Sequence, residues 1–323
     1  MIPQKNGIAL LLISAACLLA SVNCNSRFFS PTEPTATSDS GLIAVDTPEG
    51  QIQWSPYLVV QPDGGAVEGY RKALSALKSR GMVRGARVGL NSYRDPVTQM
   101  LVSLGIEMTG IVPNQDLFDP NPEAMIDRYI SIYPDIRVFQ IGNEVTTINQ
   151  SQGTPKMTIE QYMDVFLKIY RHVVVTYPSL TLMTQSTIGS GSYGGSELKR
   201  MTELGLRPET ISPQRVIVGI NLYSDDAFGE YVSARSQYLD NPSQGGYRIW
   251  VMETGDIPQS NHISHVKSFY PRLASALGAE RIYWYALWAG DGPPDAGFSL
   301  IQHPYDATQM TYSPLYKALA GMQ

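Results

Sequence analysis

Two glutamates close otherwise apolar segments of this sequence and are its strongest candidates for chemistry. Glu144 ends the run RVFQIGNE at residues 137–144, and Glu253 lies in the run RIWVMETG at residues 248–255. A buried carboxylate is costly unless it has polar partners or faces a cavity. A strand-end glutamate that pairs with a loop arginine would explain one such case. Two of them indicate a pair of carboxyl groups that act together.

A pair of carboxyl groups facing one cavity can cleave a glycosidic bond. At a separation of about 5–5.5 Å they act as nucleophile and acid/base with retention, and at about 6.5–9.5 Å they leave room for a water and inversion. The sequence does not fix this separation. Carboxyl groups supply both the proton transfer and the covalent intermediate, so we expect no metal and no organic cofactor.

Other candidate motifs are weaker. Residues 189–194, GSGSYG, match a dinucleotide-binding GxGxxG pattern, but they follow the fifth predicted strand rather than the first, and we interpret them as a rim loop. His262 and His265 are three residues apart on a predicted helix, and we expect them on a solvated face rather than at a metal. The sequence contains no GxSxG nucleophile motif.

Beyond residue 50, short runs rich in β-branched and aromatic residues alternate with stretches of helical periodicity. Eight strands are predicted, at Tyr57–Gln61, Ala86–Asn91, Glu107–Val112, Arg137–Glu144, Leu180–Thr187, Val216–Tyr223, Arg248–Gly255 and Arg281–Trp288. Asp95-Pro96 is typical of a helix start. Helix ends are predicted at Gly81, Gly105, Gly205 and Gly278. A last helix is expected over Pro314–Met322. Eight such units in one domain predict an α/β fold, a single-domain (β/α)8 TIM barrel, with a doubly wound sheet as the competitor.

A barrel of this kind gathers its chemistry at the carboxyl ends of the strands. The polar and aromatic residues at those ends are Asn91, Asn143, Glu144, Asn221, Tyr223, Glu253, Trp288 and Asp291. Side chains alternate along a strand, so we expect Glu144 to share the inward face with Gln140, and Glu253 with Val251.

The same alternation predicts the aromatic residues. Tyr223 faces inward if Asn221 does. Trp284 and Trp288 share a face, so one ring could lie beneath a bound sugar while the deeper one packs inside the barrel. Trp250 has the opposite parity to Glu253 and is expected under the helices.

At these residues the sequence resembles the clan A glycoside hydrolases, which carry catalytic glutamates at the ends of strands four and seven. Several phrases are similar to family 17, the β-1,3-glucanases and glucan transferases. These are Tyr93 with Asp95-Pro96, GIEMTGIVPNQDL at 105–117, FQIGNEV at 139–145, NLY at 221–223 and METG at 252–255. Their order covers about residues 86 to 255. Two features depart from family 17: Gly255 is followed by Asp256-Ile257-Pro258 rather than Gly-Trp-Pro, and YWYALW at 283–288 resembles other clan A families.

The resemblance implies a role for each matching residue. Glu144 would be the acid/base and Glu253 the nucleophile. The substrate-binding set would be Asn143 at the sugar 2-hydroxyl, Tyr223 on Glu253, Trp288 beneath the cleaved sugar, and Asn221 beside them. Arg87 would either support Glu253 or form a structural salt bridge.

These features together predict a retaining β-glycosidase whose partner is a carbohydrate, with β-1,3-glucan as the leading substrate. Two alternatives stay open: a glucan transglycosylase that uses the same site, and a glycan-binding barrel without catalysis.

Composition agrees with an exported globular enzyme. The chain has 323 residues, 43% hydrophobic and 16% charged, with a net charge of -5, which excludes a disordered chain and, without a basic run, nucleic acid as the main partner. Residues 1–24 contain Lys5 and the apolar run at 7–20, typical of a signal peptide. Residues 25–50 form a Ser/Thr/Pro-rich tether, and 51–323 the catalytic domain, expected to be a monomer.

The two cysteines, Cys17 and Cys24, both lie in the leader. Attachment to a membrane through a lipid on one of them stays open. The tether suits an anchor, but neither cysteine has the leucine usually found three positions upstream. The expected location is extracellular or periplasmic.

Overall fold

The computed structural model describes residues 57–60, 64–146, 156–187, 193–240 and 246–322. The description below concerns the unit Ile43–Gln323. The predicted signal peptide, the tether and most of the GxGxxG segment lie outside the described residues.

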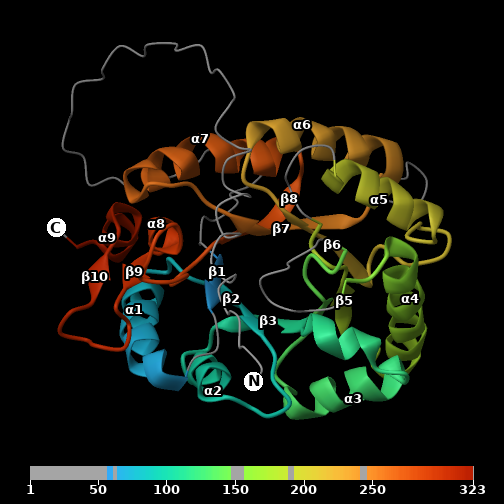
Figure 1. Ribbon diagram of the computed structural model, residues 1–323, viewed down its shortest axis with the longest axis horizontal. Helices are drawn as coiled ribbons and strands as arrows, with labels where there is room; N and C mark the ends of the chain where they lie inside the picture. Colours follow the sequence, from blue (N-terminus) through green and yellow to red (C-terminus); the bar gives the residue numbers. More distant parts are fainter. Residues whose placement is uncertain (1–56, 61–63, 147–155, 188–192, 241–245, 323) are drawn as a thin grey trace, which may run out of the picture. The chain divides into compact units, whose positions relative to one another are not determined.

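Eight parallel strands form a closed barrel in sequential order, which confirms the predicted fold (Figure 1). The strands are β1 Tyr57–Val60, β2 Gly85–Gly89, β3 Glu107–Val112, β4 Val138–Ile141, β5 Thr181–Met183, β6 Val216–Asn221, β7 Arg248–Thr254 and β8 Ala279–Trp284. The first and last strands close the barrel with Tyr57 opposite Tyr283 and Leu58 opposite Trp284.

Helices surround the strands in the alternation expected for this fold. The α-helices are α1 Val67–Ser79, α2 Pro96–Ser103, α3 Pro122–Ile132, α4 Ile159–Thr176, α5 Tyr193–Glu203, α6 Asp225–Ala234, α7 His262–Ser275, α8 Asp295–Phe298 and α9 Pro314–Ala320. The short elements are η1 Gly64–Ala66, η2 Asn114–Phe118, η4 Arg235–Leu239, η5 Gln259–Asn261, and the two-stranded hairpin β9 Ile301–Gln302 with β10 Thr311–Tyr312.

The helix boundaries follow the predicted capping signals. The Asp95 side chain accepts a hydrogen bond from the Thr98 amide, and Pro96 occupies the first turn of α2, where its missing N–H costs nothing. Thr158 and Gln161 cap α4 reciprocally. The predicted end glycines Gly81, Gly105, Gly205 and Gly278 all have positive φ.

Two apolar layers form the core, and they correct the predicted positions of two tryptophans. Trp250 belongs to the small cluster inside the barrel, together with Met252 and Tyr283, instead of lying under the helices. Trp284 belongs to the large cluster between strands and helices. Val251 is also in that outer layer, so it does not share a face with Glu253 as alternation predicted.

Several predicted strands end earlier in the structure, among them β4, β5, β6 and β8. β4 ends at Ile141, so Glu144 lies in the following loop, and β8 ends at Trp284, four residues before Trp288. In β7 the pairing with β8 shifts between Val251 and Thr254, a bulge-type irregularity. Such an irregularity changes the face that the next side chain occupies, which brings Glu253 inward directly after the inward-facing Met252.

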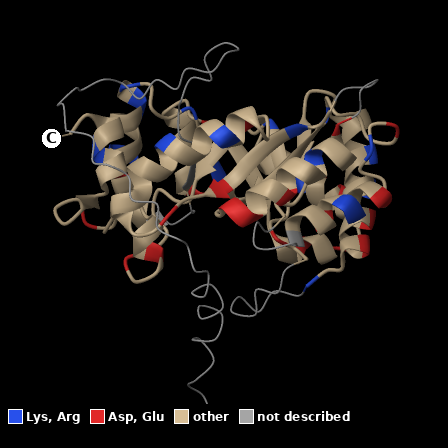
Figure 2. Ribbon diagram, turned by 90° about the horizontal axis from the view of Figure 1, so that it is seen from above, with Lys and Arg blue, Asp and Glu red and all other residues tan. Residues whose placement is uncertain are grey.

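Acidic and basic residues are interspersed over the helices (Figure 2). In the described part of the chain, no helix is long and apolar enough to cross a membrane.

Candidate active site

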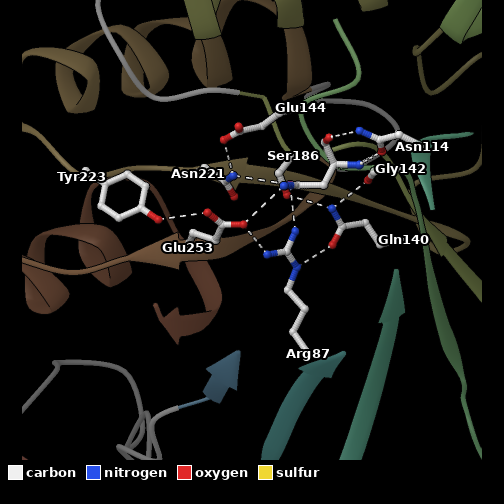
Figure 3. Close-up of polar contacts among 10 residues, drawn as sticks. Arg87, Asn114, Gln140, Gly142, Glu144, Ser186, Asn221, Tyr223 and Glu253 are labelled. Carbon is white, nitrogen blue, oxygen red and sulfur yellow. Dashed lines mark hydrogen bonds and ion pairs between the residues drawn. The ribbon is translucent and has the colours of Figure 1, made fainter. Parts of the chain in front are cut away.

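A buried arginine is the centre of a polar network at the carboxyl ends of the strands (Figure 3). Arg87 on β2 is 1% exposed. Its guanidinium donates to Gln140 Oε1 at 2.8 Å, to Asn143 Oδ1 at 2.8 Å and to Glu253 Oε1 at 2.5 Å. An uncompensated buried guanidinium would be costly, and these three acceptors meet that need. Arg87 is therefore both a structural element of the barrel and the cation beside Glu253.

Three side chains hold the Glu253 carboxylate. Besides Arg87 at one oxygen, the Tyr223 hydroxyl donates to the other, Oε2, at 2.9 Å, and Asn143 Nδ2 lies 3.4 Å from Oε1. Burial and the charge of Glu253 raise the pKa of the Tyr223 phenol well above its usual value, so the phenol remains a donor. Glu253 is thus a fixed carboxylate with a cation at its side.

Glu144 enters the site through a departure from extended backbone. Gly142 has φ 74° and Glu144 has φ 48°, and a Cβ on Gly142 would lie 2.4 Å from Val145 Cγ2. Strand alternation cannot point Asn143 and Glu144 into one site, whereas left-handed backbone on either side of Asn143 does. The Glu144 amide donates to Ser186 O at 3.1 Å, which fixes this conformation.

The environment of Glu144 favours its protonated form. Burial, and next the charge of Glu253, raise its pKa from 4.5 to about 7. Asn221 Nδ2 donates to Glu144 Oε1 at 2.6 Å, and this bond, like the charge of Arg87, partly offsets the increase. A carboxyl group with such a pKa can deliver and recover a proton near neutral pH.

Further polar side chains brace the loop that carries Asn143 and Glu144, and the sequence analysis did not single them out. Asn114 donates to Asn143 O at 2.7 Å and accepts from the Asn143 amide at 2.8 Å. Gln185 accepts from the Val145 amide at 2.7 Å. Asn114 lies inside the phrase that resembles family 17, which was the one available signal for it.

Tyr285, directly after β8, is an aromatic residue beside the site that the sequence analysis had not named. Tyr285 packs edge-on against Tyr223 with ring centroids 6.4 Å apart, and the charge of Glu253 helps to raise its pKa to about 12, after burial. Trp288 instead donates to Asp291 at 3.0 Å and packs against Tyr305. Within the described residues, no hydrogen bond joins Trp288 to either glutamate.

Two other strand-end residues form hydrogen bonds with partners other than the glutamates. Asn91 bonds through its backbone to the Tyr133 hydroxyl, and Asp291 accepts from the His303 amide as well as from Trp288. Among the described residues, no group of three or more His, Cys, Asp or Glu side chains is arranged to hold a metal ion.

His262 and His265 do not form the solvated face that was expected. His262 is fully buried, and both imidazoles contact the Trp284 ring, at 4.6 and 5.8 Å between centroids. His265 Nε2 and Thr254 Oγ1 share a hydrogen bond at 3.1 Å. Burial lowers the pKa of both imidazoles, so they act as neutral core side chains behind β7 and β8.

Solved structures with the same fold include two carbohydrate-related proteins. Gas2p of Saccharomyces cerevisiae, in complex with laminaritriose and laminaritetraose, matches with a TM-score of 0.57 and 12% identity over 83% of this chain and 63% of that one. Bacteroides uniformis β-glucuronidase 2, covalently bound to cyclophellitol-6-carboxylate aziridine, matches with a TM-score of 0.52 and 15% identity. That match covers 78% of this chain and 33% of the other. At these identities the likeness establishes the fold. No family model matches the sequence. No curated protein matches it either.

Proposed function

We propose that the chain is a retaining β-glycosidase of the clan A type, with Glu253 as nucleophile and Glu144 as acid/base. The observation that carries the proposal is the asymmetry of the two glutamates at one barrel mouth. Glu253 is a carboxylate held by Arg87, Tyr223 and Asn143, whereas burial and the neighbouring carboxylate raise the pKa of Glu144 to about 7. A carboxylate oriented by a cation and two donors suits a nucleophile, and a neighbouring carboxyl group with a raised pKa suits an acid.

The proposed reaction has two steps. Glu253 attacks the anomeric carbon while the bond to the leaving oxygen breaks, and that oxygen takes the proton of Glu144. Glu144, now ionised, then removes a proton from an incoming water or acceptor hydroxyl, which displaces Glu253 and restores both groups. Asn143 is proposed to hold a sugar hydroxyl, since its Oδ1 and Nδ2 already lie between Arg87 and Glu253.

β-1,3-glucan is the proposed substrate. The family 17 phrases favour it, and Gas2p, which shares the fold, was solved with laminari-oligosaccharides. The chain spans about 63% of the length of Gas2p, so the activity of the whole of that protein is not transferred here.

Azide rescue of glutamate variants tests the assignment. Glu253→Ala should abolish turnover of an activated aryl β-glycoside, and azide should restore it with an inverted product, because azide enters from the vacated face. Glu144→Ala should lose about 10²–10⁴-fold on poor leaving groups and give a retained azide product. Glu107→Ala is the matched control, since Glu107 lies at the opposite end of the barrel, paired with Arg281.

The outcomes separate the alternatives. Reversed azide stereochemistry would exchange the two roles, and full activity in both variants would exclude this site. Sizing the products from laminarin then distinguishes the reactions: shorter chains indicate hydrolysis, longer chains indicate transfer to an acceptor sugar, and binding without products indicates a glycan-binding barrel.

A further inference from the structure

The backbone carbonyls of the four residues 296–299 accept hydrogen bonds from side chains of other elements. Gln259 Nε2 of η5 donates to Ala296 O at 2.9 Å and to Ser299 O at 3.0 Å. His262 Nε2 of α7 donates to Gly297 O at 2.7 Å, and Trp284 Nε1 of β8 to Phe298 O at 3.0 Å. We call these three donors, Gln259, His262 and Trp284, the carbonyl clamp. Ala296, Gly297 and Phe298 belong to the one-turn helix α8, and the last carbonyls of a helix have no partner within it, so these side-chain donors fix the end of α8.

The clamp itself is rigid. Trp284 and His262 are both fully buried, and their rings are in contact. On the other side of the segment, the Leu300 amide donates to the carbonyls of Ala286 and Leu287, each at 3.1 Å. The backbone of 296–300 is therefore tied to η5, α7, β8 and the segment after β8.

The segment presents one ring toward the glutamate site. Phe298 packs edge-on against Tyr223 and Tyr285, with centroids 5.9 Å apart in both cases. Tyr223 in turn donates to Glu253 Oε2 at 2.9 Å. Gly255 permits this packing, because a Cβ there would lie 3.1 Å from Phe298 Cδ1 and 2.9 Å from Tyr285 O.

We propose that Phe298 is a positioning residue for Glu253. Its ring, fixed by the carbonyl clamp, holds the Tyr223 ring at the angle at which the hydroxyl meets the carboxylate. Edge-to-face contacts define the angle between two rings, so Phe298 and Tyr285 together fix the direction of the Tyr223 hydroxyl. A nucleophile must be aligned with its target, and small misplacements are costly in rate. The effect on rate rests on the proposed glycosidase function; the effect on Tyr223 does not.

A double-mutant cycle measures this connection. Phe298→Leu should lower kcat roughly ten-fold with little change in KM, the size expected for one misdirected hydrogen bond to a charged group. In a Tyr223→Phe background, which lacks the hydroxyl, Phe298→Leu should cause little further loss. Phe228→Leu is the matched control, because Phe228 is also half-buried and packs against another ring, Phe269, at 5.9 Å. Equal losses from Phe298→Leu in both backgrounds would overturn the proposal.

A second measurement needs no turnover. With 3-fluorotyrosine at position 223, Glu253→Gln should move the ¹⁹F resonance, and Phe298→Leu should move or broaden it as well. Gln259→Ala removes two bonds of the clamp from a partly exposed position, so it should fold and give a smaller effect in the same direction. A resonance unchanged by Phe298→Leu would overturn the proposal. A shifted resonance in a protein without activity on glycans would instead keep the positioning role and reject the glycosidase function.

Discussion

At the scale of single residues, opposing effects determine the pKa of Glu144 and therefore its protonation state. Burial and the Glu253 carboxylate raise its pKa, and the Asn221 amide and Arg87 lower it. The sequence predicted Asn221 at the site, as a residue that binds substrate. The structure shows Asn221 donating to Glu144 and 3.4 Å from Asn143, so it is connected to both members of the Asn-Glu motif.

Asn221→Ala should shift the pH profile of the proposed enzyme. The amide donates to the ionised form of Glu144, so its loss raises the pKa of that carboxyl above about 7. The acid form is needed for the first step, and activity falls as pH rises through this pKa. The alkaline limb of kcat/KM should therefore move to higher pH, with a lower maximum.

The control is Asn121→Ala, which removes the N-cap of α3, where the side chain accepts from the Ala124 amide. It should cost about 1 kcal/mol of stability and leave the profile unchanged. An alkaline limb that moves to lower pH in Asn221→Ala would contradict the assigned effect of this bond.

At the scale of elements, the periodic pattern predicted all eight strands because buried barrel strands are short, β-branched runs between helices. It could not predict where regular structure stops. Alternation placed Glu144 and Glu253 inward, and both do lie in the site, but for a different reason in each case. Left-handed backbone turns Glu144, and a pairing irregularity in β7 turns Glu253. The same irregularity inverted the expected faces of Trp250 and Val251.

The buried His262 makes the α7–β8 side of the barrel sensitive to acid. Burial lowers its pKa below the ordinary 6.5, so the unfolded chain takes up the proton first as pH falls. The contribution of neutral His262 to stability is present above about pH 6.5 and is lost at lower pH, although the nearby Asp256 charge limits the effect. His262→Gln can keep a donor for Gly297 O and removes the titration.

Denaturant unfolding at two pH values measures this effect. Between pH 7.5 and pH 5, His262→Gln should lose less stability than the unaltered protein, because only the unaltered protein has this buried imidazole to protonate. Equal losses in the two proteins would show that His262 keeps its ordinary pKa when folded.

At the scale of the whole molecule, the described barrel contains every residue of the proposed site. The strands and helices from Tyr57 onward form the closed barrel and its surrounding helices. We propose that residues 1–24 direct export and that 25–50 act as a spacer.

Expression of the full chain with its leader tests the export proposal. The apolar run at 7–20 is followed by small residues and a polar spacer, so we expect an extracytoplasmic product that lacks residues 1 to about 24. N-terminal sequencing of the product and palmitate labelling are the measurements.

Labelling that is lost in Cys17→Ser or Cys24→Ser would identify an anchored form, because a lipid needs a cysteine at the new terminus. Retained labelling in both single variants would place the lipid elsewhere. A full-length product inside the cell would reject export. It would not affect the proposed glycosidase activity, which depends on residues from Arg87 onward and is tested by the glutamate variants.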